Sequence, residues 1–145
     1  MGNRQSYIKK VNFEDIQEFI KKKMNNCILI NTLNKDEQTC LINGTILVSD
    51  EEKIINSCLK QKLQEKINII IYDKNAHQQK LLEKYEQLNS LGFLNVFMYT
   101  GGLFEWLLLQ DIYGTDEFPT TSSELHILNY KAPSAFKNKL LLENI

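Results

Sequence analysis

The residues best placed to do chemistry lie where an apolar run meets a polar loop, in the stretch NIIIYDKNAH at residues 68–77. Residues 67–72 have the composition of a buried strand, and a helix is expected to begin at about residue 78. Loops at such junctions commonly hold the reactive group of α/β enzymes. Asp73 and His77 therefore suggest either an acid-base pair or an aspartate nucleophile.

Neither form of catalysis is well supported by the neighbouring residues. A phosphate-accepting aspartate needs magnesium and a second carboxylate close by, and Asn75 is not a carboxylate. His77 is expected to be an exposed loop histidine, and His126 lies far along the chain with no evident partner. We therefore expect no metal and no cofactor at this loop.

The composition limits the class of protein and of partner. A chain of 145 residues with 43% hydrophobic residues and a formal charge of −1 fits one globular domain, without general attraction for nucleic acid. The 17 basic residues include a single arginine, Arg4, although arginine is the preferred bidentate binder of phosphate. A phosphate-transfer site is therefore poorly equipped, and the lysine-rich composition suits a protist or a large DNA virus.

The cysteines and the hydropathy indicate a reducing, cytoplasmic environment. Cys27, Cys40 and Cys58 are odd in number and show no C-x-x-C spacing, which argues against a zinc site. Buried thiols are expected. No run approaches the roughly 18 apolar residues of a spanning helix, and the polar N-terminal segment lacks a signal-peptide core.

The N-terminal residues 1–6, MGNRQS, fit the acylation pattern M-G-x-x-x-[ST], in which Gly2 receives myristate. One myristoyl chain binds membranes only marginally, so a second signal is needed. Basic residues near the chain start are candidates for it, namely Arg4, Lys9, Lys10 and 21–23. The alternative is that residues 21–23 are only the solvated, dipole-favoured end of a helix. We expect a protein peripheral on a membrane face, or associated with a virion if the protein is viral.

Strand-like and helix-like segments alternate along the chain, which predicts a parallel sheet with helices on its faces. About five strands are expected, at residues 7–11, 27–30, 45–48, 67–72 and 96–99. Helices are expected at about 13–24, 49–59, 78–89 and 103–110. Asn12 is expected to cap the first helix, and Ser49 with Glu52 forms a capping box for the second.

Two segments resemble the rhodanese-like domain family. Residues 91–106, LGFLNVFMYTGGLFEW, resemble the family's C-terminal signature of a strand, a glycine pair and a tryptophan, here Gly101, Gly102 and Trp106. Residues 40–49 resemble an upstream family segment and retain its isoleucine and its second glycine, Gly44. The resemblance covers roughly residues 7–112 and implies a doubly wound α/β domain with a central parallel sheet.

The resemblance also implies a catalytic cysteine at the end of the strand at 67–72, where this chain has Asp73. A carboxylate does not form the transferable persulfide that a thiolate forms. Other family features are also absent: Asn31 replaces an acid, Leu33 replaces a basic residue, and a phosphatase arginine is missing at 78–80. The loop Asp73, Lys74, Asn75, Ala76, His77 and Gln78 is therefore interpreted as a degenerate active site. The backbone amides of such a loop, at the N-terminus of a helix, can form a nest that binds an anion. We expect Asp73 to accept these amide hydrogen bonds itself and so to close the nest.

Three functional hypotheses remain open. The leading one is a catalytically inactive, myristoylated adaptor or structural component that binds an unknown protein partner, with residues 7–113 as the domain. The second is a sulfurtransferase or phosphatase-like enzyme that uses Cys40, Cys58 or Asp73. The third is a small-anion sensor. Residues 114–145 form a C-terminal extension that either wraps its own domain, which we favour, or binds a partner.

Overall fold

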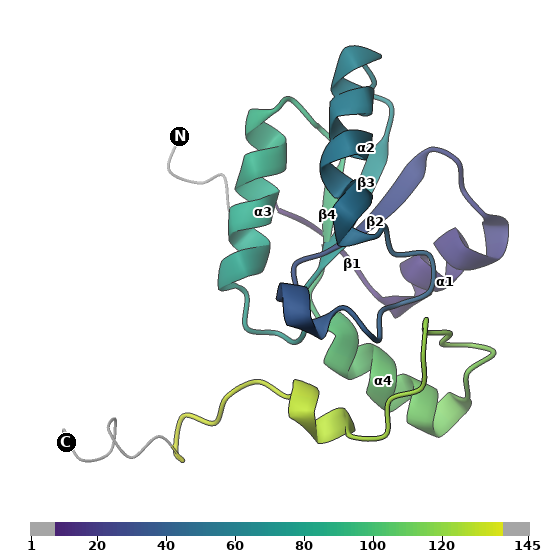
Figure 1. Cartoon of the computed structure of the whole chain (residues 1–145), viewed down its shortest axis with the longest axis vertical. Coiled ribbons are helices and arrows are strands. Elements are labelled where there is room, and N and C mark those ends of the chain that lie inside the picture. The colour runs from purple at the N-terminus through teal and green to yellow at the C-terminus, as the bar shows by residue number, and fades with distance from the viewer. Residues whose placement is uncertain (1–7, 138–145) are drawn as a thin grey trace.

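The sheet of this protein has four parallel strands, β1 (Lys9–Val11), β2 (Cys27–Asn31), β3 (Asn68–Tyr72) and β4 (Val96–Tyr99), in the order β1-β4-β3-β2. The computed structural model describes residues 8–137 (Figure 1). In β2, β3 and β4 nearly every residue is buried or half-buried, as a parallel sheet covered on both faces requires. Because all strands run the same way, their carboxyl ends meet at one edge, which holds the loop after β3.

Helices cover both faces of the sheet. Helices α1 (Phe13–Lys22) and α4 (Gly102–Tyr113) pack on one face, against Leu29, Ile70 and Tyr99. Helices α2 (Val48–Lys60) and α3 (Gln79–Ser90) pack on the other, against Ile30, Ile71 and Met98. Successive strand residues thus point to opposite cores. The predicted doubly wound α/β fold is confirmed.

The first helix begins as its sequence predicts. The Asn12 side chain accepts hydrogen bonds from the amides of Glu14 and Asp15, and the Asp15 carboxylate accepts one from the Asn12 amide. This capping box satisfies amides that the helix itself leaves unpaired. The helix ends earlier than expected, at Lys22, and Lys23 adopts a left-handed conformation with φ 47°.

The predicted strand at 45–48 does not form, so the sheet has four strands rather than five. Thr45 makes one isolated bridge with Leu29, and the Ile46 amide donates to the Leu29 carbonyl (2.9 Å). The chain then turns at once into α2, whose first residue is Val48. The capping box expected at Ser49 is also wrong, because the residue before the helix is Leu47 and makes no side-chain cap. Asp50 and Glu51, the acids in the first turn of α2, favour a helix N-terminus, which competes with strand pairing.

The chain beyond α4 packs against the domain along 118–122 and again near the short helix η3 (Ile127–Tyr130). Phe118 is buried, Thr120 forms a bridge with Ile42, and the Trp106 indole donates to the Pro119 carbonyl (3.1 Å). The Asn43 amide also donates to Pro119 (3.0 Å). We call residues 118–133 the C-terminal strap. Gly2, Arg4 and the last residues of the extension lie outside the described residues.

Candidate functional site

Asp73 directly follows β3 and is almost fully buried, with 7% of its surface exposed. Its Oδ1 accepts a hydrogen bond from the Lys74 amide (2.7 Å). Burial raises the pKa of this carboxyl group above its usual range, and the hydrogen bonds from Lys74 and Thr32 offset part of that rise. The residue at the base of the loop is therefore an enclosed carboxyl group.

The N-terminus of α4 fixes the loop backbone. The Leu103 amide donates to the Asp73 carbonyl (2.9 Å), and the Phe104 amide donates to the Lys74 carbonyl (2.8 Å). Gly102 makes this approach possible, because a Cβ there would lie 2.6 Å from the Asp73 carbonyl oxygen and 3.0 Å from the Asn75 nitrogen. Its φ of +69° is also in the region that favours glycine. The loop carbonyls of Asp73 and Lys74 are thus bonded to amides in the first turn of α4.

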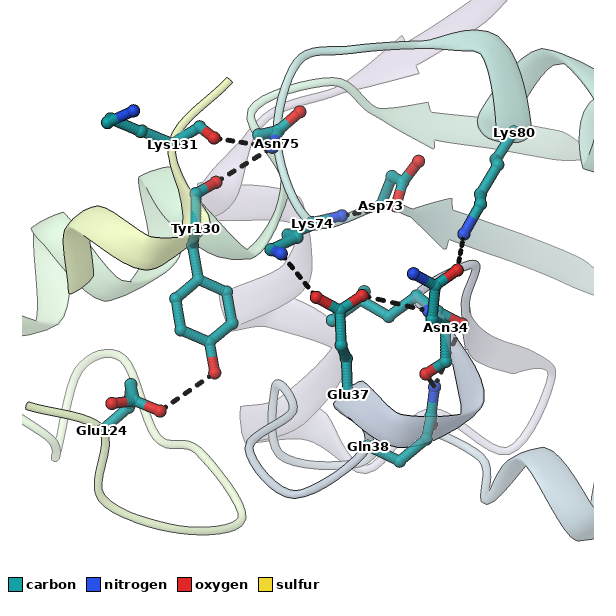
Figure 2. A network of polar contacts seen from close by, with 11 residues as sticks. Asn34, Glu37, Gln38, Asp73, Lys74, Asn75, Lys80, Glu124, Tyr130 and Lys131 are labelled. Carbon is teal, nitrogen blue, oxygen red and sulfur yellow. Dashed lines mark hydrogen bonds and ion pairs between the residues drawn. The ribbon is translucent and has the colours of Figure 1, made fainter. Parts of the chain in front are cut away.

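Asn75 closes the loop on itself and also joins it to the strap, and Figure 2 shows its bonds to the strap. Its Oδ1 accepts from the His77 amide (2.9 Å), as in an Asx turn. Its Nδ2 donates to the carbonyl oxygens of Tyr130 (3.0 Å) and Lys131 (3.2 Å). Among the backbone amides of loop residues 74–78, Lys74 donates to the Asp73 carboxylate and His77 donates to Asn75, so part of the closure expected of Asp73 is performed by Asn75.

Lys74 connects the loop to two further segments. Its ammonium group pairs with Glu37, the last residue of the short helix η2 (Lys35–Glu37), and lies 5.7 Å from the centre of the Tyr130 ring. The bond from Lys74 lowers the pKa of Glu37. The Tyr130 hydroxyl donates to Glu124 (3.0 Å), and burial together with that carboxylate raises the pKa of Tyr130 to about 12. Figure 2 shows these contacts as one network across the mouth of the loop.

A hollow of about 370 Å³ remains beside the loop. Its lining carries both charges: the acidic residues are Asp73 and Glu37, the lysines are Lys74, Lys80 and Lys131, and His77 is also part of the wall. The Lys80 ammonium group donates to Asn34. A cradle for an anionic group is normally lined by donors alone, so the two carboxyl groups weaken this site for anions.

Asn31 and Leu33, where the sequence also departs from the family pattern, are uncharged residues with structural contacts. The Asn31 side chain accepts from the Leu33 amide (3.0 Å) and from the Gln38 amide group (2.8 Å). Leu33 is buried in the core. Neither residue supplies a charge to the loop.

The three cysteines are enclosed, and none of them lines the hollow beside the loop. Cys27, Cys40 and Cys58 are 7%, 2% and 6% exposed, and all are free thiols. Burial raises the pKa of each, that of Cys27 to about 11. Cys40 donates to the Ser122 carbonyl (3.4 Å) in the strap. Thiols of this kind are poor nucleophiles.

The glycines and the tryptophan of the family signature lie in turns and in the core. Gly44 has φ +91° and faces the Phe19 ring, Gly101 precedes α4, and Trp106 is fully buried against Phe118. Among residues 8–137 there is no group of three or more His, Cys, Asp or Glu side chains that could hold a metal. In the same part of the chain, no helix has the length and apolar character needed to cross a membrane.

The sequence interpretation missed the closing role of Asn75 and the participation of the strap. The spacing Asn-x-His is typical of an Asx turn and could have indicated the first. Contacts of Asn75 with Tyr130 and Lys131 span 55 and 56 residues, and no local pattern indicates them.

A parallel α/β sheet with helices on both faces and a strand-to-helix loop at its carboxyl edge defines the class of this protein. Within that class, the family model of the rhodanese-like domain matches residues 14–109, so the chain belongs to the rhodanese-like family. No curated protein sequence matches this chain.

Solved structures agree on the fold at low sequence identity. The rhodanese-like domain of an Anabaena protein is 17% identical with TM-score 0.53, over 87% of this chain and 86% of that one. A thiosulfate sulfurtransferase from Pseudomonas aeruginosa is 17% identical with TM-score 0.56, over 73% of this chain and 20% of that one. A yeast protein tyrosine phosphatase of the rhodanese family is 15% identical with TM-score 0.53, over 79% and 92%. Family members therefore include proteins described as sulfurtransferases and as phosphatases.

Proposed function

We propose that this chain is a rhodanese-like domain without catalytic activity, which serves as an adaptor or structural component on a membrane face. The single observation that carries the proposal is the identity and state of Asp73. At the end of β3 the chain presents a buried carboxyl group, bonded to the next amide, where sulfur transfer needs an accessible thiolate. A carboxylate oxygen cannot accept and release a sulfane sulfur atom.

The arrangement around Asp73 supports the same proposal. The strap carbonyls of Tyr130 and Lys131 occupy the donors of Asn75, and Lys74 is engaged by Glu37. Phosphoryl transfer needs donors that converge on the developing charge, whereas here several donors are already bonded within the protein. The closed network and the neighbouring polar loop at 34–38 together suit a surface that a protein partner recognises.

Activity assays on the pure protein test the proposal. We expect no turnover in thiosulfate:cyanide sulfur transfer or in aryl-phosphate hydrolysis, and the same result for Asp73→Ala. Repeated turnover by the wild type that Asp73→Ala abolishes would refute the proposal. Asp73→Cys is the informative companion: because Asn75 and the strap still close the loop, we expect it to remain inactive.

The alternative enzyme would use one of the other thiols. The burial and raised pKa of Cys40 and Cys58 oppose it. Intact mass after treatment with a persulfide donor separates the two hypotheses, because a stable gain of about 32 Da on one cysteine would favour a sulfur carrier. We expect no such adduct in the folded protein.

A small-anion sensor is a second candidate, favoured by the 370 Å³ hollow with Lys80 and His77 in its wall. A ligand that binds only the folded state raises the melting temperature. Titration with sulfate, thiosulfate and phosphate, with Lys80→Gln as the matched variant, tests this candidate. We expect no shift, because Asp73 and Glu37 face the same hollow.

Membrane attachment is proposed to occur through myristate on Gly2, aided by Arg4, Lys9 and Lys10. Co-expression with the acyl transferase and intact-mass measurement test the modification, and Gly2→Ala is the control. An unmodified N-terminus would remove the acyl anchor from the proposal.

A further inference from the structure

The edge of the sheet opposite the degenerate site carries exposed lysines and leucines. We define the amino-edge surface as Lys9, Lys23, Lys62, Lys66, Leu91 and Leu94, all of which are exposed. The residues lie at the start of β1 and in the loops that follow α1, α2 and α3. In Figure 1 the loops after α2 and α3 lie at the top, whereas η2 and α4 lie at the opposite end.

Direct contacts join these loops into one face. The Asn68 amide donates to the Asn26 carbonyl (2.8 Å), which connects the loop after α1 to the loop after α2. The Leu94 amide donates to the Gln64 carbonyl (3.2 Å), which connects the loops after α2 and α3. The Lys9 ammonium group donates to the Leu94 carbonyl (3.5 Å) and adds β1 to the same face.

The positive charge of this surface is largely uncompensated. Within the described part of the chain, neither Lys23 nor Lys62 nor Lys66 forms an ion pair, whereas Lys21 and Lys22 pair with Glu117 and Glu18. Only Glu65 among the charged residues 60–66 is acidic. The surface therefore carries four lysines, with Glu65 as the acidic residue in the loop between Lys62 and Lys66.

Backbone conformation gives an independent reason to regard these lysines as selected. Lys23 and Lys62 are the two residues other than glycine with positive φ in the described chain, at 47° and 56°. Helices commonly end with glycine or asparagine at such positions, because a side chain with a Cβ is strained there. A lysine near a helix carboxyl end interacts favourably with the helix dipole, but it can do so without adopting positive φ. We therefore attribute the presence of lysine, in place of glycine or asparagine, at these two positions to a role for its charge.

We infer that the amino-edge surface binds an anionic lipid bilayer, with the lysines on the headgroups and Leu91 and Leu94 entering the interface. The leucines are 40% and 58% exposed and lie beside the lysines. A lipid surface accepts such apolar side chains between cationic ones, whereas nucleic-acid surfaces typically use arginine forks and exposed aromatic rings. Bound in this way, the protein would point its degenerate loop and strap away from the membrane.

This inference deepens the proposed membrane attachment and rests on it for its setting, but it can be tested without acylation. Unacylated full-length chain is sedimented with phosphatidylcholine vesicles that contain about a quarter phosphatidylserine, and with phosphatidylcholine alone. Binding is expected only to the anionic vesicles and is expected to weaken as salt is added. Equal binding to both vesicles, or binding to neither, would overturn the inference.

Lys23→Asn with Lys62→Asn is the decisive variant, because asparagine tolerates positive φ and the fold should be kept or stabilised. The partition coefficient is expected to fall about fivefold for each lysine, or about 25-fold together. Lys35→Gln with Lys53→Gln is the matched control, which removes two exposed charges elsewhere. Unchanged binding of the Asn variant, or an equal loss in the control, would overturn the inference.

Orientation is measured with an environment-sensitive dye on Leu94→Cys and on Leu125→Cys, because the native cysteines are buried. A blue shift on vesicles is expected at position 94 and not at position 125, which is 86% exposed on the strap. The reverse pattern would overturn the inference, and so would binding to RNA with none to vesicles. If the lysine dependence holds while intact mass shows no myristate, only the acyl anchor fails. If acylated protein binds without lysine dependence, only this surface fails.

Discussion

Replacing Asn75 by aspartate separates the two functions of its side chain. Aspartate keeps the acceptor for the His77 amide but loses both donors to Tyr130 and Lys131, and Asn75 is only 8% exposed. The two lost hydrogen bonds contribute about 1 kcal/mol each, and a carboxylate facing two carbonyl oxygens adds roughly as much again. The free energy that holds the strap against the loop should therefore fall by about 3–4 kcal/mol.

Hydrogen exchange of peptides that cover residues 124–132 measures this loss locally. Because these contacts join the strap to the loop, we expect exchange there to become faster by up to about 150- to 900-fold, which corresponds to the 3–4 kcal/mol loss, while α1 and α2 keep their protection. The control is Asn89→Asp, which makes the same charge change at an exposed position of α3. Unchanged exchange in Asn75→Asp would show that the strap is held by other contacts and would refute the reasoning.

Three further substitutions test the packing and the titration of the site. Gly102→Ala should destabilise in urea by about 1–3 kcal/mol more than Gly114→Ala, because both have positive φ but only Gly102 meets backbone atoms; equal losses would contradict the clash. Phe118→Ala should lower the unfolding free energy by about 3–4 kcal/mol, since its ring is buried 5.0 Å from that of Trp106, and a loss typical of a surface site would contradict this. The folded-state pKa of Asp73 is raised above 3.8, so its contribution to stability is present below that pH and is lost as pH rises through the folded pKa. Asp73→Asn should therefore gain stability relative to wild type between acid and neutral pH, and a pH-independent difference would contradict the raised pKa.

Local patterns in the sequence were sufficient for most of the fold. Apolar runs predicted β2, β3 and β4, and helical periodicity with the Asn12 cap predicted α1, because burial and capping depend on residues close together in the chain. The strand expected at 45–48 fails because pairing depends on a neighbour: only Thr45 bridges to Leu29 before helix α2 begins. Strand formation is decided between segments, whereas helix formation is decided largely within one.

For the site, the sequence by itself determined that a carboxyl group, and not a thiol, follows β3, because the side-chain chemistry of Asp73 is the same in any conformation. Only the tertiary structure decided how the loop is closed: Asn75 binds its own loop and the strap, and α4 approaches through Gly102. The same holds for the amino-edge surface, because backbone hydrogen bonds join the separate loops that carry Lys23, Lys62 and Leu94. Side-chain chemistry is a property of each residue, but these contacts join residues far apart in the chain, and only the folded backbone brings them within hydrogen-bonding distance.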